Sequence, residues 1–251
     1  KKGVLINKLD SITKIHGIKQ WFFDKTGTLT EPFMSLNKTH VIGDISEQQA
    51  ISIMAAIEHN SSHPIATAFN DYYDSQIITQ NYKTQANKGI QATINQDSYR
   101  AGTKSWCDNN SDFIIDSPHT VIYLSKNNQL MAVFELENKL RHGSQNLINL
   151  LHEKNHQVAI ISGDKSAAVK DIADQLKITE YYSEQSPEFK INRIKQLQSQ
   201  KISTIMIGDG VNDAPVLAQS DVSISFNQGT QLARAASDLI IMGNSLKSVE
   251  S

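Results

Sequence analysis

The chain reads WFFDKTGTLT at residues 21–30, and this stretch indicates how the chain folds. Three bulky apolar residues lead to Asp24, and a loop that contains Gly27 follows. Two other places have the same form, an apolar run that ends close to an aspartate: residues 158–161 before Asp164, and residues 205–208 before Asp209. Short apolar runs followed by glycine and polar residues are typical of buried strands.

The segments around these runs carry helical patterns, at residues 142–153, 166–176 and 188–199. Strands that alternate with helices predict a doubly wound α/β fold, whose parallel sheet binds ligands beyond the carboxyl ends of its strands. If the three strands are neighbours, their aspartates meet in one crevice. Because close carboxylates repel one another, such a cluster favours a hard cation such as Mg²⁺ and indicates metal-assisted chemistry on a phosphate.

The region after the first strand has a different character. An apolar stripe over residues 46–59 predicts a helix with Ser46 as its N-cap, and Pro64 suits the first turn of a second helix over 64–74. Alternating stretches predict an antiparallel sheet at residues 82–86, 90–95, 98–102, 119–125 and 129–135. We therefore predict an α+β domain over residues 34–133, inserted into an α/β domain of residues 1–33 and 134–251.

Composition excludes several classes of protein. The 251 residues are 39% hydrophobic and 20% charged, enough for one large or two ordinary domains. The net charge of −2 gives no indication of binding to nucleic acid or to an acidic membrane surface. The single cysteine, Cys107, fits a reducing compartment and a packing role. No stretch approaches the ~18 apolar residues of a membrane span, and no signal peptide is recognisable.

The heptad DKTGTLT at residues 24–30 is the strongest local signal of function. A carboxylate at the end of a strand can attack a phosphoryl group and form an acyl phosphate. Amides around Gly27 and the hydroxyls of Thr26 and Thr28 could hold the transferred oxygens. We would interpret a lone aspartate in a turn as a hydrogen-bonded turn residue. The complete heptad instead favours a nucleophilic role for Asp24.

The heptad resembles the phosphorylation motif of P-type ATPases, cation pumps within the haloacid-dehalogenase-like superfamily. Three further resemblances follow in that family's order: Ser162-Gly163-Asp164 is similar to its TGD motif, residues 186–190 (SPEFK) to the segment with its phosphate-contacting lysine, and residues 208–215 (GDGVNDAP) to its GDGxNDxP hinge motif. Four motifs in the right order identify the chain as a member of this family.

The resemblance implies a role for each residue of the site. Asp24 would be the nucleophile, and Mg²⁺ would be held by Asp24, the Thr26 carbonyl and Asp209. Lys190 would neutralise a phosphoryl oxygen. The other residues that the resemblance implies are Thr26, Ser162 and Gly163 as donors to the phosphoryl group, Asp164 in the same motif, and Asn212 and Asp213 in the loop and the metal shell. Asp213 also suits the N-cap of the next helix.

The residue two positions after the nucleophile separates a pump from a phosphatase. Soluble phosphatases of the superfamily usually carry a second aspartate there, as a general acid and base, whereas this chain has Thr26. A hydroxyl activates water poorly at neutral pH. We therefore expect a lasting acyl phosphate, which a pump needs in order to couple it to a conformational change.

The inserted domain carries a second resemblance. Residues 61–66 (SSHPIA) resemble the SEHP motif of heavy-metal, class IB, pumps, which implies that His63 orients ATP and that Glu58 contacts adenine. Gly89 and Gly102 would belong to the same nucleotide site. The chain departs from the family pattern where it has Asn87, Thr103 and Ser62 in place of Gly, Asn and Glu. Asparagine adopts left-handed backbone angles more readily than most residues, so the turn at Asn87 can survive.

The resemblance implies ATP and Mg²⁺ as cofactors, a place at the cytoplasmic face of a membrane, and the transmembrane and actuator domains of the same pump as partners. Residues 134–141 and 105–107 look most like copper pumps, so we expect copper rather than zinc or cadmium, and a copper chaperone as partner of the whole protein. Without an actuator domain, ATP hydrolysis would be weak. The alternatives are a soluble phosphatase with a cap domain and a binding module that has lost its chemistry.

Overall fold

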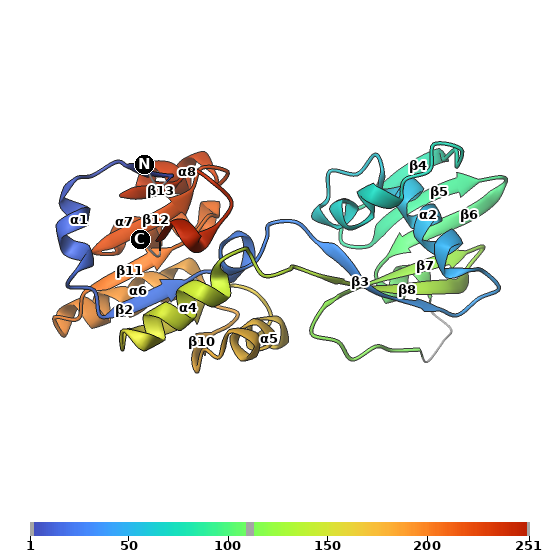
Figure 1. The fold of residues 1–251 in the computed structure, drawn as a ribbon. Helices are drawn as coiled ribbons and strands as arrows, with labels where there is room; N and C mark the ends of the chain where they lie inside the picture. Colours follow the sequence, from blue (N-terminus) through green and yellow to red (C-terminus); the bar gives the residue numbers. More distant parts are fainter. Residues whose placement is uncertain (1–2, 109–112, 250–251) are drawn as a thin grey trace. The chain divides into compact units, whose positions relative to one another are not determined.

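The computed structural model describes residues 3–108 and 113–249, which form two compact units (Figure 1). Unit 1 consists of the chain up to Pro32 together with the chain from Leu140 onward, and unit 2 consists of Phe33–Lys139. We expected the second crossing between the units at residues 133/134, and it lies at 139/140 because the last strand of unit 2 continues to Glu137. None of the helices in the described residues combines the length and the hydrophobicity that a membrane span requires.

Unit 1 is an α/β unit whose elements alternate along the chain. They are β1 (Val4–Ile6), α1 (Asp10–Ile15), β2 (Gln20–Phe23), the helical turn η1 (Lys25–Leu29), α4 (Ser144–Glu153), β9 (Gln157–Ile161), α5 (Ser166–Leu176), β10 (Glu180–Tyr182), α6 (Pro187–Ser199), β11 (Thr204–Ile207), the turn η3 (Val211–Asp213), α7 (Ala214–Gln219), β12 (Val222–Phe226), α8 (Gln231–Ala236), β13 (Leu239–Ile241) and the turn η4 (Leu246–Val249). In the described residues the strand order is β1-β13-β12-β11-β2-β9-β10, and every pair except β1–β13 is parallel.

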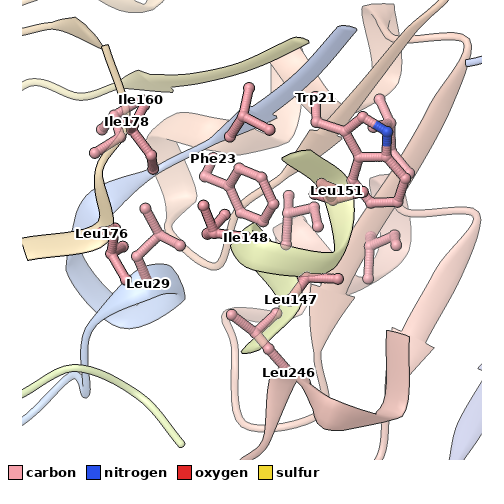
Figure 2. Close-up of a cluster of buried hydrophobic side chains, with 14 of the residues drawn as sticks. Trp21, Phe23, Leu29, Leu147, Ile148, Leu151, Ile160, Leu176, Ile178 and Leu246 are labelled. Atoms are coloured by element: carbon pink, nitrogen blue, oxygen red, sulfur yellow. The ribbon is translucent and has the colours of Figure 1, made fainter. Parts of the chain in front are cut away.

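The central strand β2 is buried on both faces, which explains its unbroken apolar run. Trp21 and Phe23 pack toward α4 and α5, in a cluster that includes Leu147 and Leu151 (Figure 2). Phe22 points to the other face, where α6, α7 and α8 supply the apolar side chains. Helices on both faces make this the doubly wound parallel fold that we predicted.

Unit 2 is an antiparallel sheet with helices, as predicted. Its elements are β3 (Ser35–Val41), α2 (Glu47–Glu58), the 3₁₀ helix η2 (Pro64–Tyr72), β4 (Gln80–Gln85), β5 (Gly89–Ile94), β6 (Asp97–Gly102), α3 (Lys104–Cys107), β7 (Thr120–Lys126) and β8 (Gln129–Glu137), and the strand order is β3-β8-β7-β6-β5-β4. Ser46 caps α2, since its hydroxyl accepts from the Gln49 amide at 3.2 Å and its own amide donates to the Gln49 side chain at 3.1 Å. Such a capping box stabilises a helix by about 1 kcal/mol.

Several elements have no counterpart in our prediction, among them β1, α1 and β3. Strand β3 is a polar edge strand with the sequence SLNKTHV, and it owes its conformation to pairing with β8. Strand β1 has three residues and pairs antiparallel with β13. Periodicity in the sequence does not reveal strands of this kind, because their stability comes from the partner strand.

Candidate functional site

A buried lysine bridges two of the predicted carboxylates in unit 1. Asp24 directly follows β2, and its amide donates to the carbonyl of Ile207 at the end of β11, at 2.9 Å. The Lys190 ammonium, near the start of α6, donates to Asp24 Oδ1 at 2.8 Å and to Asp213 Oδ1 at 2.9 Å. All three residues are less than 10% exposed. The arrangement places a charged donor at the carboxylate of the predicted nucleophile.

Burial controls the ionisation of this trio. It raises the pKa of Asp24 to about 7, Asp213 acts in the same direction, and Lys190 opposes the rise. Burial lowers the pKa of Lys190, but the carboxylates of Asp24 and Asp213 outweigh this effect and raise it above its ordinary value. Lys190 is therefore a permanent cation beside a carboxylate whose charge depends on pH near neutrality.

Asp213 does not cap helix α7 with its side chain. Its Oδ2 instead accepts from the Gly210 amide at 3.0 Å, while Oδ1 accepts from Lys190. These contacts close the loop after β11 and hold the lysine in place. Asn212 in the same loop is exposed.

Asp164 belongs to a separate set of contacts at the end of β9. Its Oδ2 accepts from the hydroxyl of Thr26 at 2.9 Å and from that of Ser162 at 2.8 Å, and the ammonium of Lys25 lies 3.4 Å away. The loops after β2 and β9 are thereby joined. The Thr26 hydroxyl uses its proton in the bond to Asp164, and a neutral hydroxyl is a poor base near pH 7. Gly163 is exposed between these residues.

The expectation that three aspartates converge is wrong as we stated it. Strands β9, β2 and β11 are neighbours, as expected. However, no group of three or more His, Cys, Asp or Glu side chains in the described residues is placed to hold a metal ion. The physical reason is charge compensation, since Asp24 is paired with Lys190 while Asp164 is paired with Lys25 and two hydroxyls.

Asp209, after β11, has an incomplete environment that suits a cation. Its Oδ1 is buried and has no hydrogen-bond partner among the described residues. Burial raises its pKa to about 6, and Arg141 opposes the rise. A Cβ atom built on Gly229 would lie 1.8 Å from Oδ1, so the glycine leaves room for this carboxylate. Carboxylate and carbonyl oxygens are the ligands that Mg²⁺ prefers, so Asp24, Asp209 and the Thr26 carbonyl fit such an ion.

Two predicted nucleotide residues of unit 2 lie at the connection between α2 and η2. Glu58 is the last residue of α2 and is buried, and its Oε2 has no partner in the part of the chain that the structure describes. Burial raises the pKa of Glu58 to about 7, and the Ser61 hydroxyl opposes the rise. His63 is exposed and caps η2, since its Nδ1 accepts from the Ile65 amide at 3.3 Å. The capping bond uses one ring nitrogen of His63 and leaves Nε2 for another partner.

The two predicted glycines face each other across β5 and β6. Gly89 and Gly102 are register partners with φ of 149° and 154°. A Cβ on Gly89 would lie 2.0 Å from the Ala101 carbonyl oxygen, so only glycine fits this crossing. Asn87, where the family has glycine, adopts the left-handed φ of 59°. A cavity of about 500 Å³ in unit 2 includes none of these residues; it lies near Asp44, Gln48, Asp97, Tyr99 and Lys126.

Two residues of the site escaped sequence reasoning. Arg141 is buried and its guanidinium donates to the carbonyls of Gly27 and Thr28. Gly229 makes room for Asp209. Arg141 stands in a stretch of mixed composition, and Gly229 stands three residues after a strand. No local pattern distinguishes them from ordinary surface and turn residues.

Comparisons with known proteins agree with this geometry. The chain is 30% identical over 281 residues to the copper-transporting ATPase of Saccharomyces cerevisiae, covering 98% of this chain and 27% of the relative. It is 26% identical over 260 residues to the zinc-transporting ATPase of Bacillus subtilis, covering 98% of this chain and 41% of the relative. The chain thus spans less than half the length of either relative.

A solved structure of the catalytic domain of the CPx-ATPase CopB-B superposes with a TM-score of 0.78 at 28% identity, covering 99% of this chain and 94% of that one. The chain is therefore similar over nearly its whole length to the catalytic region of heavy-metal P-type ATPases. The sequence profile of haloacid dehalogenase-like hydrolases matches residues 18–221, which is most of the chain. On this match, the chain belongs to the haloacid dehalogenase-like hydrolase family.

Proposed function

We propose that this chain is the ATP-binding and autophosphorylating part of a heavy-metal cation-transporting P-type ATPase. The observation that carries the proposal is the 2.8 Å contact between Lys190 and Asp24 at the carboxyl end of the central strand. The similarity to copper and zinc pumps supports it. In this proposal the chain works at the cytoplasmic face of a membrane, together with the transmembrane and actuator domains of the same pump.

The reaction that we propose is transfer of the γ-phosphoryl group of ATP to Asp24. One carboxylate oxygen forms a bond to phosphorus, the bond from phosphorus to the β–γ bridging oxygen breaks, and ADP leaves with that electron pair. Lys190 neutralises the negative charge that meets the carboxylate. We propose that the Ser162 hydroxyl, which donates to Asp164 in this structure, and the Gly163 amide donate to the phosphoryl oxygens once ATP is bound.

A divalent cation completes this site in our proposal. Asp24, Asp209 and the Thr26 carbonyl would hold Mg²⁺, with Asn212 and Asp213 supporting the loop. When bound, the ion would supply positive charge to the transferring phosphoryl group.

The acyl phosphate should persist in this chain. Thr26 occupies the position at which a phosphatase would carry a base, and its hydroxyl donates to Asp164. A hydroxyl in this state does not activate water. We therefore propose that this chain by itself turns ATP over slowly, and that the actuator domain of the pump supplies dephosphorylation.

In unit 2 we assign ATP binding to Glu58, His63, Gly89 and Gly102. The buried Glu58 Oε2 has no partner within the described protein and could accept from an exocyclic amine of the base. The Gly89–Gly102 crossing offers a surface without side chains, against which a planar base or a sugar can lie.

We propose copper as the cargo, as the sequence of residues 134–141 and of residues 105–107 suggested, with a copper chaperone as a partner of the whole pump. Cys107 itself is no metal ligand in this proposal. Its thiol is buried and donates to the carbonyls of Arg100 and Tyr123, and burial raises its pKa to about 12. Uptake of Cu⁺ and Zn²⁺ into vesicles that contain the parent pump would test the choice of copper.

Incubation of the chain with ³²P-labelled ATP and Mg²⁺, followed by acid quenching, tests the central proposal. We expect an acid-stable phosphoprotein that hydroxylamine cleaves and that Asp24→Asn abolishes. A chain that forms no phosphoprotein but rapidly hydrolyses small phosphate esters would contradict the proposal and favour a soluble phosphatase. A chain that binds ATP analogues without either activity would favour a binding module.

A further inference from the structure

Arg141 is a buried cation that the reaction proposed above does not use. It is 2% exposed. Its Nε donates to the Thr28 carbonyl at 3.0 Å, and its terminal nitrogens donate to the carbonyls of Gly27 and, at 3.2 Å, of Asn244. The guanidinium carbon lies 3.9 Å from the centroid of the Phe226 ring. With every nitrogen engaged and the plane stacked on an aromatic ring, the group has a single orientation.

The segment that begins with Arg141 also holds the rest of the loop after Asp24. The Arg141 amide and the Ser144 hydroxyl both donate to the Leu29 carbonyl, each at 2.8 Å. Three successive carbonyls, those of residues 27–29, therefore accept from residues 141–144. The Thr26 carbonyl, which we assign to the cation, is not among those held by this segment.

We propose that Arg141 is a positioning residue for phosphoryl transfer: it holds the loop of residues 25–29 so that Asp24 and the Thr26 carbonyl face the phosphate and its cation together. This inference rests on the proposed function. Lysine cannot replace it, because one ammonium group presents neither the planar fork that reaches two adjacent carbonyls nor the flat face that stacks on Phe226.

The test compares Arg141→Lys and Arg141→Met with the control Arg193→Met. Arg193 also lies over an aromatic ring in unit 1, 5.5 Å from the centroid of Tyr182, but its guanidinium donates to Glu180 and Gln196, on β10 and α6. We expect the rate of phosphoprotein formation to fall about 100-fold in both Arg141 variants, the loss that follows a misplacement of roughly 1 Å. The KM for ATP should not change, because we assign ATP binding to unit 2.

Two further readouts separate positioning from stability. Hydrogen–deuterium exchange of the peptide that covers residues 24–30 should be faster in both Arg141 variants than in wild type and in the control, and this measurement needs no activity. In Arg141→Ala, added guanidinium ion should restore part of the phosphorylation rate, whereas sodium or ammonium ions should not.

The outcomes are distinguishable. If wild type forms no phosphoprotein, the proposed function fails whatever Arg141 does, and the exchange data still report on the loop. If Arg141→Lys is folded and is phosphorylated within about threefold of wild type, or if loop exchange is unchanged, the positioning role is refuted. Loss of cooperative unfolding in every Arg141 variant would also overturn it, since the residue would then be structural only.

Discussion

Replacement of Glu58 by Gln should remove a pH-dependent cost from the stability of unit 2. The Glu58 side chain is 5% exposed, and burial raises its pKa from 4.5 to about 7. One unit of pKa corresponds to about 1.4 kcal/mol, so a rise of about 2.5 corresponds to roughly 3 kcal/mol. The carboxylate therefore makes unit 2 less stable at alkaline pH by this amount than it would be with an unperturbed group.

The sign follows from the proton balance. The folded state holds the Glu58 proton at a pH where the unfolded chain has lost it, so this contribution to stability is complete below pH 4.5 and is lost as the pH rises through 7. Glutamine does not titrate. We therefore expect the free energy of unfolding of Glu58→Gln, relative to the parent, to increase by about 3 kcal/mol between pH 4.5 and pH 8.5.

The two tryptophans allow a clean assay, because Trp21 belongs to unit 1 and Trp106 to unit 2. Urea unfolding followed by the fluorescence of Trp106 in a Trp21→Phe background reports on unit 2. Glu47→Gln, an exposed change at the other end of the same helix, is the control. A difference between Glu58→Gln and its parent that does not vary with pH would refute the reasoning.

Two further changes test unit 1. Gly229→Ala would put a Cβ atom 1.8 Å from Asp209 Oδ1, so the rate of phosphorylation by Mg·ATP should fall about 100-fold. The control Gly243→Ala meets no atom within 4 Å and should leave the rate unchanged. Phosphorylation of Gly229→Ala at the wild-type rate would contradict the assignment of Asp209. Lys190→Met leaves Asp24 buried without its cation, so the free energy of unfolding in urea should fall by about 3–5 kcal/mol at pH 8. The loss should be smaller at pH 5.5, where Asp24 is protonated. An equal loss at both pH values would show that the lost charge pair is not the cause.

Much of the architecture could be predicted because each strand of the parallel sheet carries its own signal. Trp21, Phe22 and Phe23 are apolar without interruption since both faces of β2 are covered by helices. Capping of α2 by Ser46 was equally readable, because a cap depends on neighbours three residues away. The edge strands β1 and β3 were missed because their conformation depends on β13 and β8, which are remote in the chain.

The candidate site likewise has features that the sequence predicts and features that it does not. The predicted aspartates Asp24, Asp164 and Asp209 do follow the carboxyl ends of β2, β9 and β11. Their partners were harder to predict, since the Lys190–Asp24 contact joins residues 166 positions apart. The role of Arg141 was not predicted, because we had interpreted its stretch of sequence only as a resemblance to copper pumps.

The sequence by itself determined the strands, most of the helices and the place of each aspartate at a strand end, because hydrophobic periodicity and turn residues act between near neighbours. Only the tertiary structure decided how the charges are compensated. It paired Lys190 with Asp24 and Asp213, joined Asp164 to Thr26, and left Asp209 with a buried oxygen that has no partner within residues 3–108 and 113–249. Electrostatic pairing depends on distance in space and on burial, and these follow from the order of strands in the sheet.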